Sequence, residues 1–375
     1  MSANDFIPVC EPLLAGRELE YVTKAVSGGW ISSSGSYVAE FEREFAKYLG
    51  VPYAVSTTSG TTALHLALVA AGIGPGDEVI IPAFTMIASA FAVCYTGAKP
   101  VFVDAERETW NIDPRLIEAK VSPHTRAIMP VHVYGHSCDM DALQKIADKH
   151  GLLVIEDAAE AIGSRYNGRL CGSIGDMACF SLFANKLITT GEGGMVVARD
   201  ERFIERLRYF KNLCFPLDGS RRYVHEDIGF NYRMPNVLAA IGVAQLERAD
   251  FYLERRRANA ARYNALLVGQ RGITTPPAAP WTLNSYWMYG ILIGDDFGLS
   301  RDEVMKKLKD AGIETRSFFV SMHRQPSLAK FGCDVSGAYP VTDDLAQRGL
   351  YLPSSSGLSD AQIERIVDAL LSLRQ

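Results

Sequence analysis

The sequence predicts an α/β protein in which a large domain, built on a mainly parallel sheet flanked by helices, precedes a smaller C-terminal α/β domain. From Gly76 to Asp157, short apolar runs alternate with segments of helix length, which is the pattern of βαβ units. The run Leu152 to Asp157 ends in two carboxylates and suits a strand buried on both faces. A Pro/Ala-rich stretch, Pro276 to Pro280, then separates a long charged helix from a further strand and helix pattern.

Composition limits the class of protein and its partners. The chain has 375 residues, 48% hydrophobic and 22% charged, so it is globular and long enough for two domains, which we place at residues 1–250 and 251–375. A net charge of −5, without a basic cluster interleaved with aromatics, argues against a nucleic-acid partner. Seven scattered cysteines, no signal peptide and no apolar run of membrane length predict a cytoplasmic protein with reduced thiols.

The N-terminal part is expected to hold two helices and the first strand. Helical spacing covers Gly16 to Val26 and Tyr37 to Leu49, where Gly50 ends the second helix, and Val51 to Ser56 is a short strand. The next turn opens a strongly apolar helix, and exposed amides at a helix N-terminus attract phosphate. A phosphate cradle and simple helix capping both fit this turn. The residues concerned are Ser59, Gly60 and Thr61.

The middle of the chain alternates strands and helices. Strands are expected at DEVIIP, KPVFVDA, AIMPVHVYG and LLVIED, with helices at TMIASAFAVCYTG, after Asp113-Pro114, and from Met140 to His150. Four side chains of metal-binding type lie close together in this part, but their spacing matches no common zinc pattern. We therefore expect no metal. The four residues are His132, His136, Cys138 and Asp139.

Lys186 lies at the centre of the most informative stretch, FSLFANKLITTGEGG. Its apolar neighbours offer the ammonium little water, and desolvation favours the neutral amine that attacks carbonyl groups. The polar, glycine-rich turn that follows permits a ligand to approach the backbone closely. A lysine that only snorkels at a strand end is the alternative interpretation.

Asp157 gives Lys186 a partner. Open α/β sheets bind ligands at the carboxyl ends of their strands, where Asp157 is expected. An enzyme that uses pyridoxal 5'-phosphate (PLP) needs a lysine to bind the cofactor covalently and commonly an acid against its pyridine nitrogen. Lys186 and Asp157 supply this pair, although Asp157 can also cap the segment that follows it.

The remaining third of the chain is expected to contain a functional loop and the smaller domain. A helix from Asp200 to Lys211 leads into the irregular stretch Asn212 to Arg233, which is dense in side chains that bind phosphate and hydroxyl groups. Two helices, at 235–247 and 251–268, precede the C-terminal domain. There we expect the strands SYWMYGILI and IETRSFF and the helices at 301–311 and from Ser359.

Several of these segments together resemble one known family. They are SGTTALHLAL from Ser59, GPGDEVIIP from Gly74, PVHVYG from Pro130, IEDAAEAIG from Ile155, GSIGDMACFSLFANKLITTGEGGMV from Gly172 and GFNYRMPNVLAAIGVAQLER from Gly229. Over nearly its whole length the chain resembles the DegT/DnrJ/EryC1/StrS family of sugar aminotransferases. The resemblance implies the PLP-dependent transferase fold of type I and a homodimer with shared active sites.

The resemblance also assigns roles to residues. Lys186 and Asp157 match the catalytic lysine and the acid at the pyridine nitrogen. The matches at the cofactor phosphate are Ser59, Gly60, Thr61, Ser181 and, from the other subunit, Asn231. Glu160 is expected near the cofactor's hydroxyl edge and the sugar. Further substrate contacts are expected from Arg222, Tyr223, Arg316 and His323. Relatives carry an aromatic ring at position 86 that stacks on the cofactor. Here that position is Met86, and Phe84 is expected to share the stacking role.

The expected reaction moves an amino group from L-glutamate to C4 of a nucleotide-linked 4-keto-6-deoxy sugar. The resemblance is greatest to family members that act on GDP-4-keto-6-deoxymannose, and a UDP- or dTDP-linked keto sugar remains the alternative. A branch of the family that removes the sugar 3-hydroxyl has histidine in place of Lys186. An NAD-dependent oxidoreductase would need GxGxxG after the first strand, and Ser56 to Thr62 lacks it. A non-catalytic sensor would not need both Lys186 and Asp157.

Overall fold

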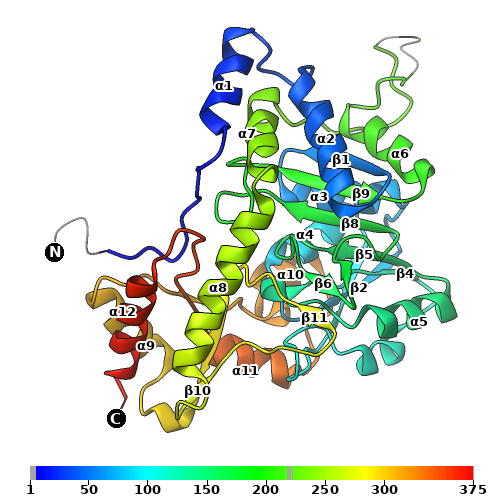
Figure 1. The fold of residues 1–375 in the computed structure, drawn as a ribbon. Coiled ribbons are helices and arrows are strands. Elements are labelled where there is room, and N and C mark those ends of the chain that lie inside the picture. Colours follow the sequence, from blue (N-terminus) through cyan, green and yellow to red (C-terminus); the bar gives the residue numbers. More distant parts are fainter. Residues whose placement is uncertain (1–5, 218–220, 222, 375) are drawn as a thin grey trace.

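The computed structural model describes residues 6–217, 221 and 223–374, and its centre is a seven-stranded sheet (Figure 1). The strand order is β1-β9-β8-β5-β4-β2-β3. The strands are β1 (Tyr53–Thr57), β2 (Glu78–Pro82), β3 (Lys99–Val103), β4 (Thr125–Ile128), β5 (Leu153–Asp157), β8 (Met177–Ser181) and β9 (Gly194–Ala198). Neighbouring strands from β3 to β8 pair in parallel, whereas β9 runs antiparallel to β8 and β1. This confirms the predicted mainly parallel sheet.

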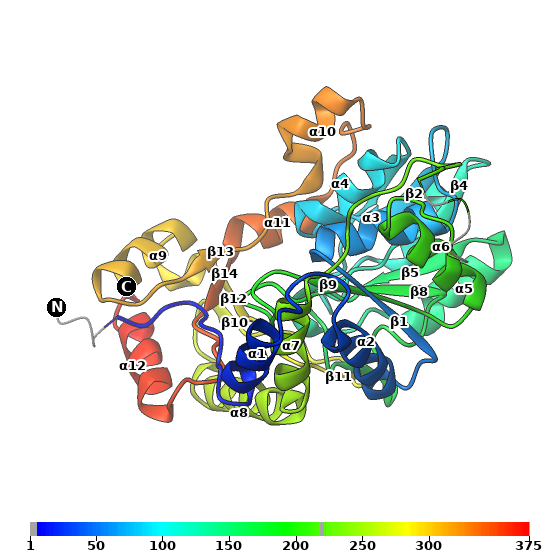
Figure 2. The same ribbon diagram turned by 90° about the horizontal axis from the view of Figure 1, so that it is seen from above.

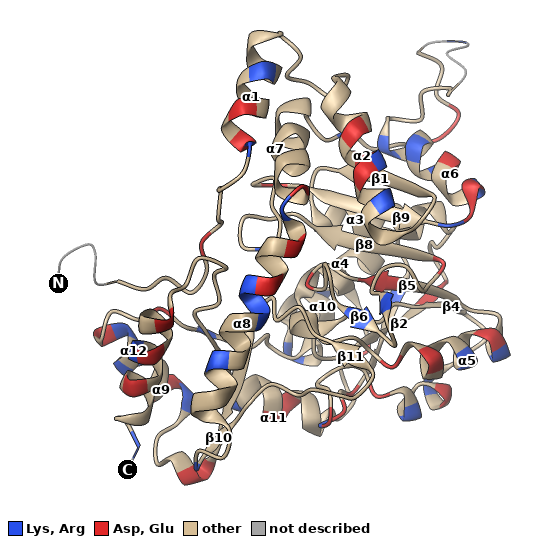
Figure 3. Cartoon of the chain, viewed as in Figure 1, with Lys and Arg blue, Asp and Glu red and all other residues tan. Residues whose placement is uncertain are grey.

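Helices cover both faces of the sheet because successive side chains of each strand point to opposite faces. On β8, Met177 and Cys179 pack toward α3 and α4, while Ala178 and Phe180 pack toward α2 and α7. The helices of this part are α1 (Glu18–Ser27), α2 (Ser36–Leu49), α3 (Gly60–Ala70), α4 (Ile87–Tyr95), α5 (Met140–His150), α6 (Glu201–Lys211), α7 (Asn236–Leu246) and α8 (Ala249–Leu267). Charged residues of both signs lie along α8 (Figure 3).

A second, four-stranded sheet lies in the C-terminal part, in the order β10-β12-β14-β13. Its strands are β10 (Ile273–Thr274), β12 (Tyr289–Ile293), β13 (Arg316–Ser317) and β14 (Gly349–Leu352). It shares a core with α8, α9 (Arg301–Asp310) and α12 (Asp360–Leu371). The short helices α10 (Pro326–Phe331) and α11 (Pro340–Arg348) and a small sheet of β6 (Arg165–Tyr166), β7 (Arg169–Leu170) and β11 (Thr282–Leu283) complete the architecture.

The N-terminal segment runs beside this C-terminal part before it reaches α1 (Figure 2). Ile7 forms a bridge with Ile313, and the Val9 N–H donates to Glu314 Oε2 at 3.0 Å. The expected division at residue 250 stays a prediction. No helix in the described ranges is long and apolar enough to cross a membrane.

Three predicted elements are wrong in form. The expected strand AIMPVHVYG ends at Ile128, and Val133–Gly135 forms a 3₁₀ turn. The segment after Asp113-Pro114 makes two 3₁₀ turns, Pro114–Leu116 and Glu118–Lys120, in place of an α-helix. Pro123 lies just beyond and disfavours helical backbone before it, which leaves too little chain for a stable helix. The expected strand IETRSFF forms a strand only at Arg316–Ser317, apart from the isolated bridge that Ile313 makes with Ile7.

Candidate active site

A cavity of about 350 Å³ opens at the carboxyl ends of the parallel strands. Its wall combines the N-terminus of α3, the loop before α4, the end of β5, the turn between β8 and β9, and aromatic side chains from the C-terminal part. Of the residues expected in the site, the wall contains Ser59, Gly60, Thr61, Met86, Asp157, Glu160, Ser181 and Lys186. Residues as far apart in the sequence as Ser59 and Tyr351 thus meet at one edge of the sheet.

Lys186 lies in the turn between β8 and β9, where its backbone N–H donates to Phe183 O at 2.9 Å. Its Nζ lies 3.5 Å from the ring centre of Trp287. Trp287 Nε1 donates to Asn185 O at 2.9 Å, which fixes the turn against the C-terminal part. Burial lowers the pKa of Lys186, and the carboxylates of Glu160 and Asp157 oppose this shift. The amine faces the cavity and an aromatic ring, whereas a snorkelling lysine would face bulk water.

Asp157 ends β5 and is buried at the base of the cavity. Its Oδ2 accepts a hydrogen bond from Ser89 Oγ at 2.7 Å, and its Oδ1 accepts one from the Ala159 N–H at 3.1 Å. Burial raises the pKa of the carboxyl, and the Ser89 hydrogen bond is the largest opposing influence. The segment after Asp157 forms turns and no helix, so the Ala159 contact is an Asx-type turn and the helix cap considered from the sequence is wrong.

Glu160 lies on the turn after β5, and its Oε2 accepts a hydrogen bond from the Tyr134 N–H at 2.7 Å. Burial raises the pKa of Glu160 to about 7, against the attraction of Lys186. Tyr134 holds this geometry with a left-handed backbone, at a φ of 52°. The cavity therefore contains a carboxyl group that titrates near neutral pH beside a lysine with a lowered pKa.

The start of α3 forms a cradle suited to an anion. Ser59 caps the helix, with its Oγ accepting from the Thr62 N–H at 3.1 Å. The amides of Gly60 and Thr61 fall in the first helical turn, where backbone N–H groups have no partner within the helix. A Cβ on Gly60 would lie 2.7 Å from Ser181 Cβ, so the glycine allows β8 and α3 to approach closely.

The residues present fit PLP. The α3 cradle suits the phosphate, Asp157 suits the pyridine nitrogen, and Lys186 suits the aldehyde carbon. In addition, Asn185 Oδ1 is buried at the cavity wall without a hydrogen-bond partner among the described atoms.

Met86 borders the cavity and remains 47% exposed. It caps α4, and its Sδ accepts from the Ala88 N–H at 3.0 Å. Phe84, considered as a second stacking group, does not line the cavity. It is fully buried against Tyr134, Phe318 and Phe319 and supports the wall from behind.

Asn231, expected at the cofactor phosphate of the other subunit, and several expected substrate contacts do not line this cavity. Asn231 and Tyr223 are exposed, and Asn231 Oδ1 accepts from Arg233 Nε at 3.0 Å. His323 Nε2 lies 3.3 Å from Asp343 Oδ1. Arg316 pairs with Tyr351 across β13 and β14, and Tyr351 does line the cavity. Arg222 lies outside the described residues.

Other residues of the site were not expected from the sequence. The cavity is also lined by Asn185, Glu192, Trp287, Phe319 and Tyr351, and Ser89 lies behind Asp157. Of these residues, Ser89 could have been predicted from the sequence, because it falls on the first turn of the helix that follows the loop on the ligand side. The aromatic residues come from the C-terminal part, and no local pattern points to them.

The side chains of metal-binding type have partners within the fold. His132 Nε2 lies 2.9 Å from Glu156 Oε2, and its Nδ1 accepts from the Cys138 N–H at 3.1 Å. Asp139 caps α5, as expected. Within the described ranges, no three His, Cys, Asp or Glu residues are grouped as a metal site.

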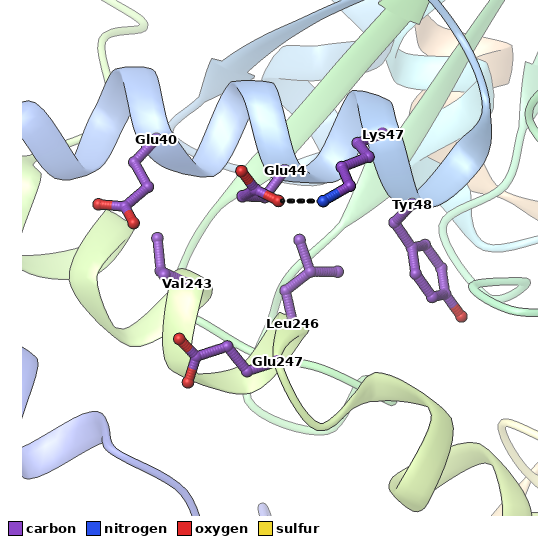
Figure 4. Close-up of a pocket in the computed structure, with 7 residues that line it drawn as sticks. All are labelled: Glu40, Glu44, Lys47, Tyr48, Val243, Leu246 and Glu247. Carbon is purple, nitrogen blue, oxygen red and sulfur yellow. Dashed lines mark ion pairs between the residues drawn. The ribbon is translucent and has the colours of Figure 1, made fainter.

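A second hollow lies between α2 and α7 (Figure 4), and its lining differs from that of the cavity. Its polar groups are mainly surface carboxylates, and Lys47, which pairs with Glu44 at 3.5 Å, is 80% exposed. The hollow is lined by Glu40, Glu44, Lys47, Tyr48, Val243, Leu246 and Glu247.

The profile of the DegT/DnrJ/EryC1/StrS aminotransferase family matches residues 12–371. The chain belongs to this family. Its relatives include GDP-perosamine synthase of Caulobacter vibrioides, to which it is 46% identical over 372 residues, with 99% of each chain covered. It is 43% identical over 365 residues to GDP-perosamine synthase of Escherichia coli O157:H7, covering 97% of this chain and 98% of the relative.

Solved structures agree with the family assignment. The PLP form of the putative sugar aminotransferase Spr1654 from Streptococcus pneumoniae superposes with a TM-score of 0.92 at 28% identity, and 98% of each chain is covered. The aminotransferase family and the α/β fold are thus shown for this chain, and the fold prediction is confirmed.

Proposed function

We propose that this aminotransferase uses PLP to move an amino group from L-glutamate to C4 of GDP-4-keto-6-deoxymannose, which gives GDP-perosamine. One observation carries the proposal. Lys186, Asp157 and the α3 cradle meet in one cavity of a chain that is 46% identical over 372 residues to a GDP-perosamine synthase. The seven cysteines are all free thiols, which supports a reducing, cytoplasmic environment.

Different residues of the cavity perform different parts of the proposed amino transfer. PLP, when bound, supplies an electron sink for the carbon that loses a proton. Lys186 Nζ would hold the cofactor at rest and, when the donor amine takes its place, would be free to act as a base. In the first half-reaction it would carry the proton of the donor Cα to the cofactor, and in the second it would carry a proton from the cofactor to sugar C4. Within each half-reaction, Glu160 and Asp157 would stabilise Lys186 while it holds the proton as an ammonium.

Water exclusion and orientation come from the walls. Trp287, Phe319 and Tyr351 form an apolar side of the cavity, which strengthens the interactions among the charged groups inside. Asp157 faces the same space from the base and suits the pyridine nitrogen. The cradle of Ser59, Gly60, Thr61 and Ser181 would hold the phosphate and fix the position of the cofactor.

The homodimer belongs to this proposal as well. Asn231 is exposed on its own protomer, which supports a role in a neighbouring site. Large apolar side chains also remain exposed, including two at the cavity mouth, and a second copy of the chain would cover them. These side chains are Trp30, Ile31, Met86, Phe183 and Ile228.

Absorption spectroscopy tests the function. The purified protein supplied with PLP should show a visible band that bleaches with L-glutamate and returns on addition of GDP-4-keto-6-deoxymannose. The same experiment with dTDP- and UDP-linked 4-keto-6-deoxy sugars measures the choice of nucleotide, and Lys186→Ala should lack the resting band. Bleaching without recovery by the GDP sugar would remove the substrate assignment, and a complete lack of a band would remove the role of Lys186.

A further inference from the structure

Ser89 lies directly behind the carboxylate of Asp157. It sits on the first turn of α4, is 1% exposed, and its Oγ donates to Asp157 Oδ2 at 2.7 Å. The Ala159 N–H donates to the other oxygen, Oδ1, at 3.1 Å. Each carboxylate oxygen therefore has its own donor, which restricts rotation of the carboxylate and leaves lone pairs available toward the cavity.

The serine is itself held in place. Its backbone N–H donates to Met86 O at 3.3 Å, and its Oγ lies 3.1 Å from the hydroxyl of Thr85, which is fully buried. Ser89 has one hydroxyl proton, and a carboxylate can only accept. The proton of Ser89 therefore points to Asp157. The single hydroxyl proton of Thr85 has two acceptors within reach, Ser89 Oγ at 3.1 Å and Met86 O at 3.3 Å, so Ser89 does not need to donate to Thr85.

We propose that Ser89 is a positioning residue, which keeps the Asp157 carboxylate ionised and aimed at the pyridine nitrogen of PLP. The inference rests on the proposed function. Burial alone favours a protonated Asp157, and a protonated acid cannot balance the charge of a protonated pyridine nitrogen. A hydrogen bond to the ionised form opposes this effect, and Ser89 supplies the shorter of the two such bonds.

Other titratable groups around Asp157 influence the ionisation of its carboxyl in both directions. Lys186, on the turn after β8, and His132, after β4, favour the ionised carboxylate. Glu160, on the turn after β5, and Cys179, on β8, lie near Asp157 and would disfavour a second negative charge. None of these contacts is changed when the Ser89 hydroxyl is removed, so a Ser89 variant isolates one hydrogen bond.

The test compares Ser89→Ala and Ser89→Thr with the wild-type protein. Ser89→Ala removes one oxygen from a helix, so the chain is expected to fold, and far-UV circular dichroism checks this. We expect Ser89→Ala to weaken PLP binding, measured by fluorescence titration of the cofactor-free protein, by about 10-fold or more. We also expect the visible band of the bound cofactor to change its pH dependence. Ser89→Thr restores the hydroxyl and should return both readouts toward wild type.

Ser354→Ala is the matched control. Ser354 is 3% exposed and its Oγ donates to Leu352 O at 2.7 Å, but it lies outside the cavity lining. This variant should lower thermal stability and leave PLP affinity and the pH dependence of the band unchanged. Equal PLP affinity and an equal pH profile for Ser89→Ala and wild type would overturn the inference. If wild type itself forms no PLP band, the proposed function fails instead, so the two failures are distinguishable.

Discussion

Glu160 is a buried carboxyl of the cavity whose pKa is raised toward neutral pH. Its side chain is buried, its Oε2 accepts the Tyr134 N–H, and its pKa is raised to about 7 because burial penalises the carboxylate. A carboxyl with a raised pKa binds its proton more tightly in the folded chain than in the unfolded chain. Its contribution to stability is complete below the unfolded pKa near 4.5 and decreases as the pH rises toward 7.

Replacing Glu160 by Gln should therefore change the pH dependence of stability. At pH 8 the cofactor-free Glu160→Gln protein should have a free energy of unfolding about 1–3 kcal/mol higher than wild type, because a buried charge is removed. Near pH 4.5 the two proteins should be alike. Urea unfolding at both pH values measures this difference. Glu192→Gln, an exposed change on the same cavity wall, is the control, and an equal gain at both pH values would contradict the prediction.

At the level of single residues, the polar groups of the cavity could be predicted from the sequence, but the apolar wall could not. Lys186 and Asp157 stand out because desolvated ionisable groups at strand ends carry a local signal. Trp287 carries none, since it reaches Lys186 from 101 positions further along the chain, and only the packing of the C-terminal part brings the two together. Asn231 was expected from family resemblance alone, and within one protomer it remains on the surface.

The N-terminus of α3 shows how a whole element depends on one small residue. Gly60 permits the helix to begin against the end of β8, with Ser181 as the contact. This approach places the first-turn amides at the cavity.

Gly60→Ala should disturb this contact, because its Cβ would meet the Cβ of Ser181, which cannot move without its strand. We expect a loss of about 1–3 kcal/mol in stability and a smaller stabilisation by saturating PLP than in wild type. Thermal unfolding with and without PLP measures both effects. Gly74→Ala, where the nearest neighbour of a Cβ would be Thr96 O at 3.9 Å, should change neither.

Glu156 joins the end of β5 to two neighbouring loops. Its carboxylate is fully buried and accepts hydrogen bonds from His132 and from the N–H groups of Gly172, Ile174 and Gly175. Burial would raise its pKa, but these donors outweigh burial and hold the pKa below its ordinary value. Its contribution to stability is therefore present above the unfolded pKa and is lost as the pH falls.

Glu156→Gln should place an amide NH₂ against two donors. We expect a loss of about 2–4 kcal/mol in the free energy of unfolding at pH 7, because buried donors lose their acceptor. Urea unfolding measures the loss. Glu118→Gln, which affects a half-exposed ion pair with Lys149, should cost less than about 1 kcal/mol. Similar losses in the two variants would contradict this account of Glu156.

Elements whose apolar residues repeat with a clear helix or strand period could be predicted from the sequence. Elements that form only through tertiary contacts could not. The helix Met140–His150 was predicted to the residue, because Asp139 caps it and Gly151 ends it in a left-handed conformation. Strand β8 was not foreseen as a strand, since MACFS has no polar alternation and lies between irregular segments. The short strands β10, β11 and β13 have two residues each and exist only through their partners.

At the scale of the whole molecule, the exposed positions of Asn231 and the apolar cavity mouth lead to a test of site sharing. Arg233 holds Asn231 through its Nε at 3.0 Å, so the amide is presented outward in a fixed geometry. If Asn231 serves the other subunit, two different inactive subunits should complement one another.

Lys186→Ala and Asn231→Ala, unfolded and refolded together, should recover up to roughly a quarter of wild-type activity, since half of the dimers are mixed and each has one intact site. Each variant refolded alone should remain at its own low activity. Activity per subunit and light scattering measure the outcome. If the mixture merely averages the two variants, Asn231 acts within its own chain or not at all.

The contacts of the first residues have a consequence for biosynthesis. Val9 reaches a partner 305 positions away at Glu314, and the Glu11 N–H reaches Ser355 Oγ across 344 positions. Between them, Cys10 Sγ donates to Asn185 O, beside Lys186. During translation, Val9 and Glu11 cannot make these contacts until Glu314 and Ser355 have been synthesised. A nascent polypeptide therefore cannot complete the surroundings of Lys186 before translation is almost finished, and prematurely terminated chains should neither retain PLP nor protect their N-terminal segment from proteases.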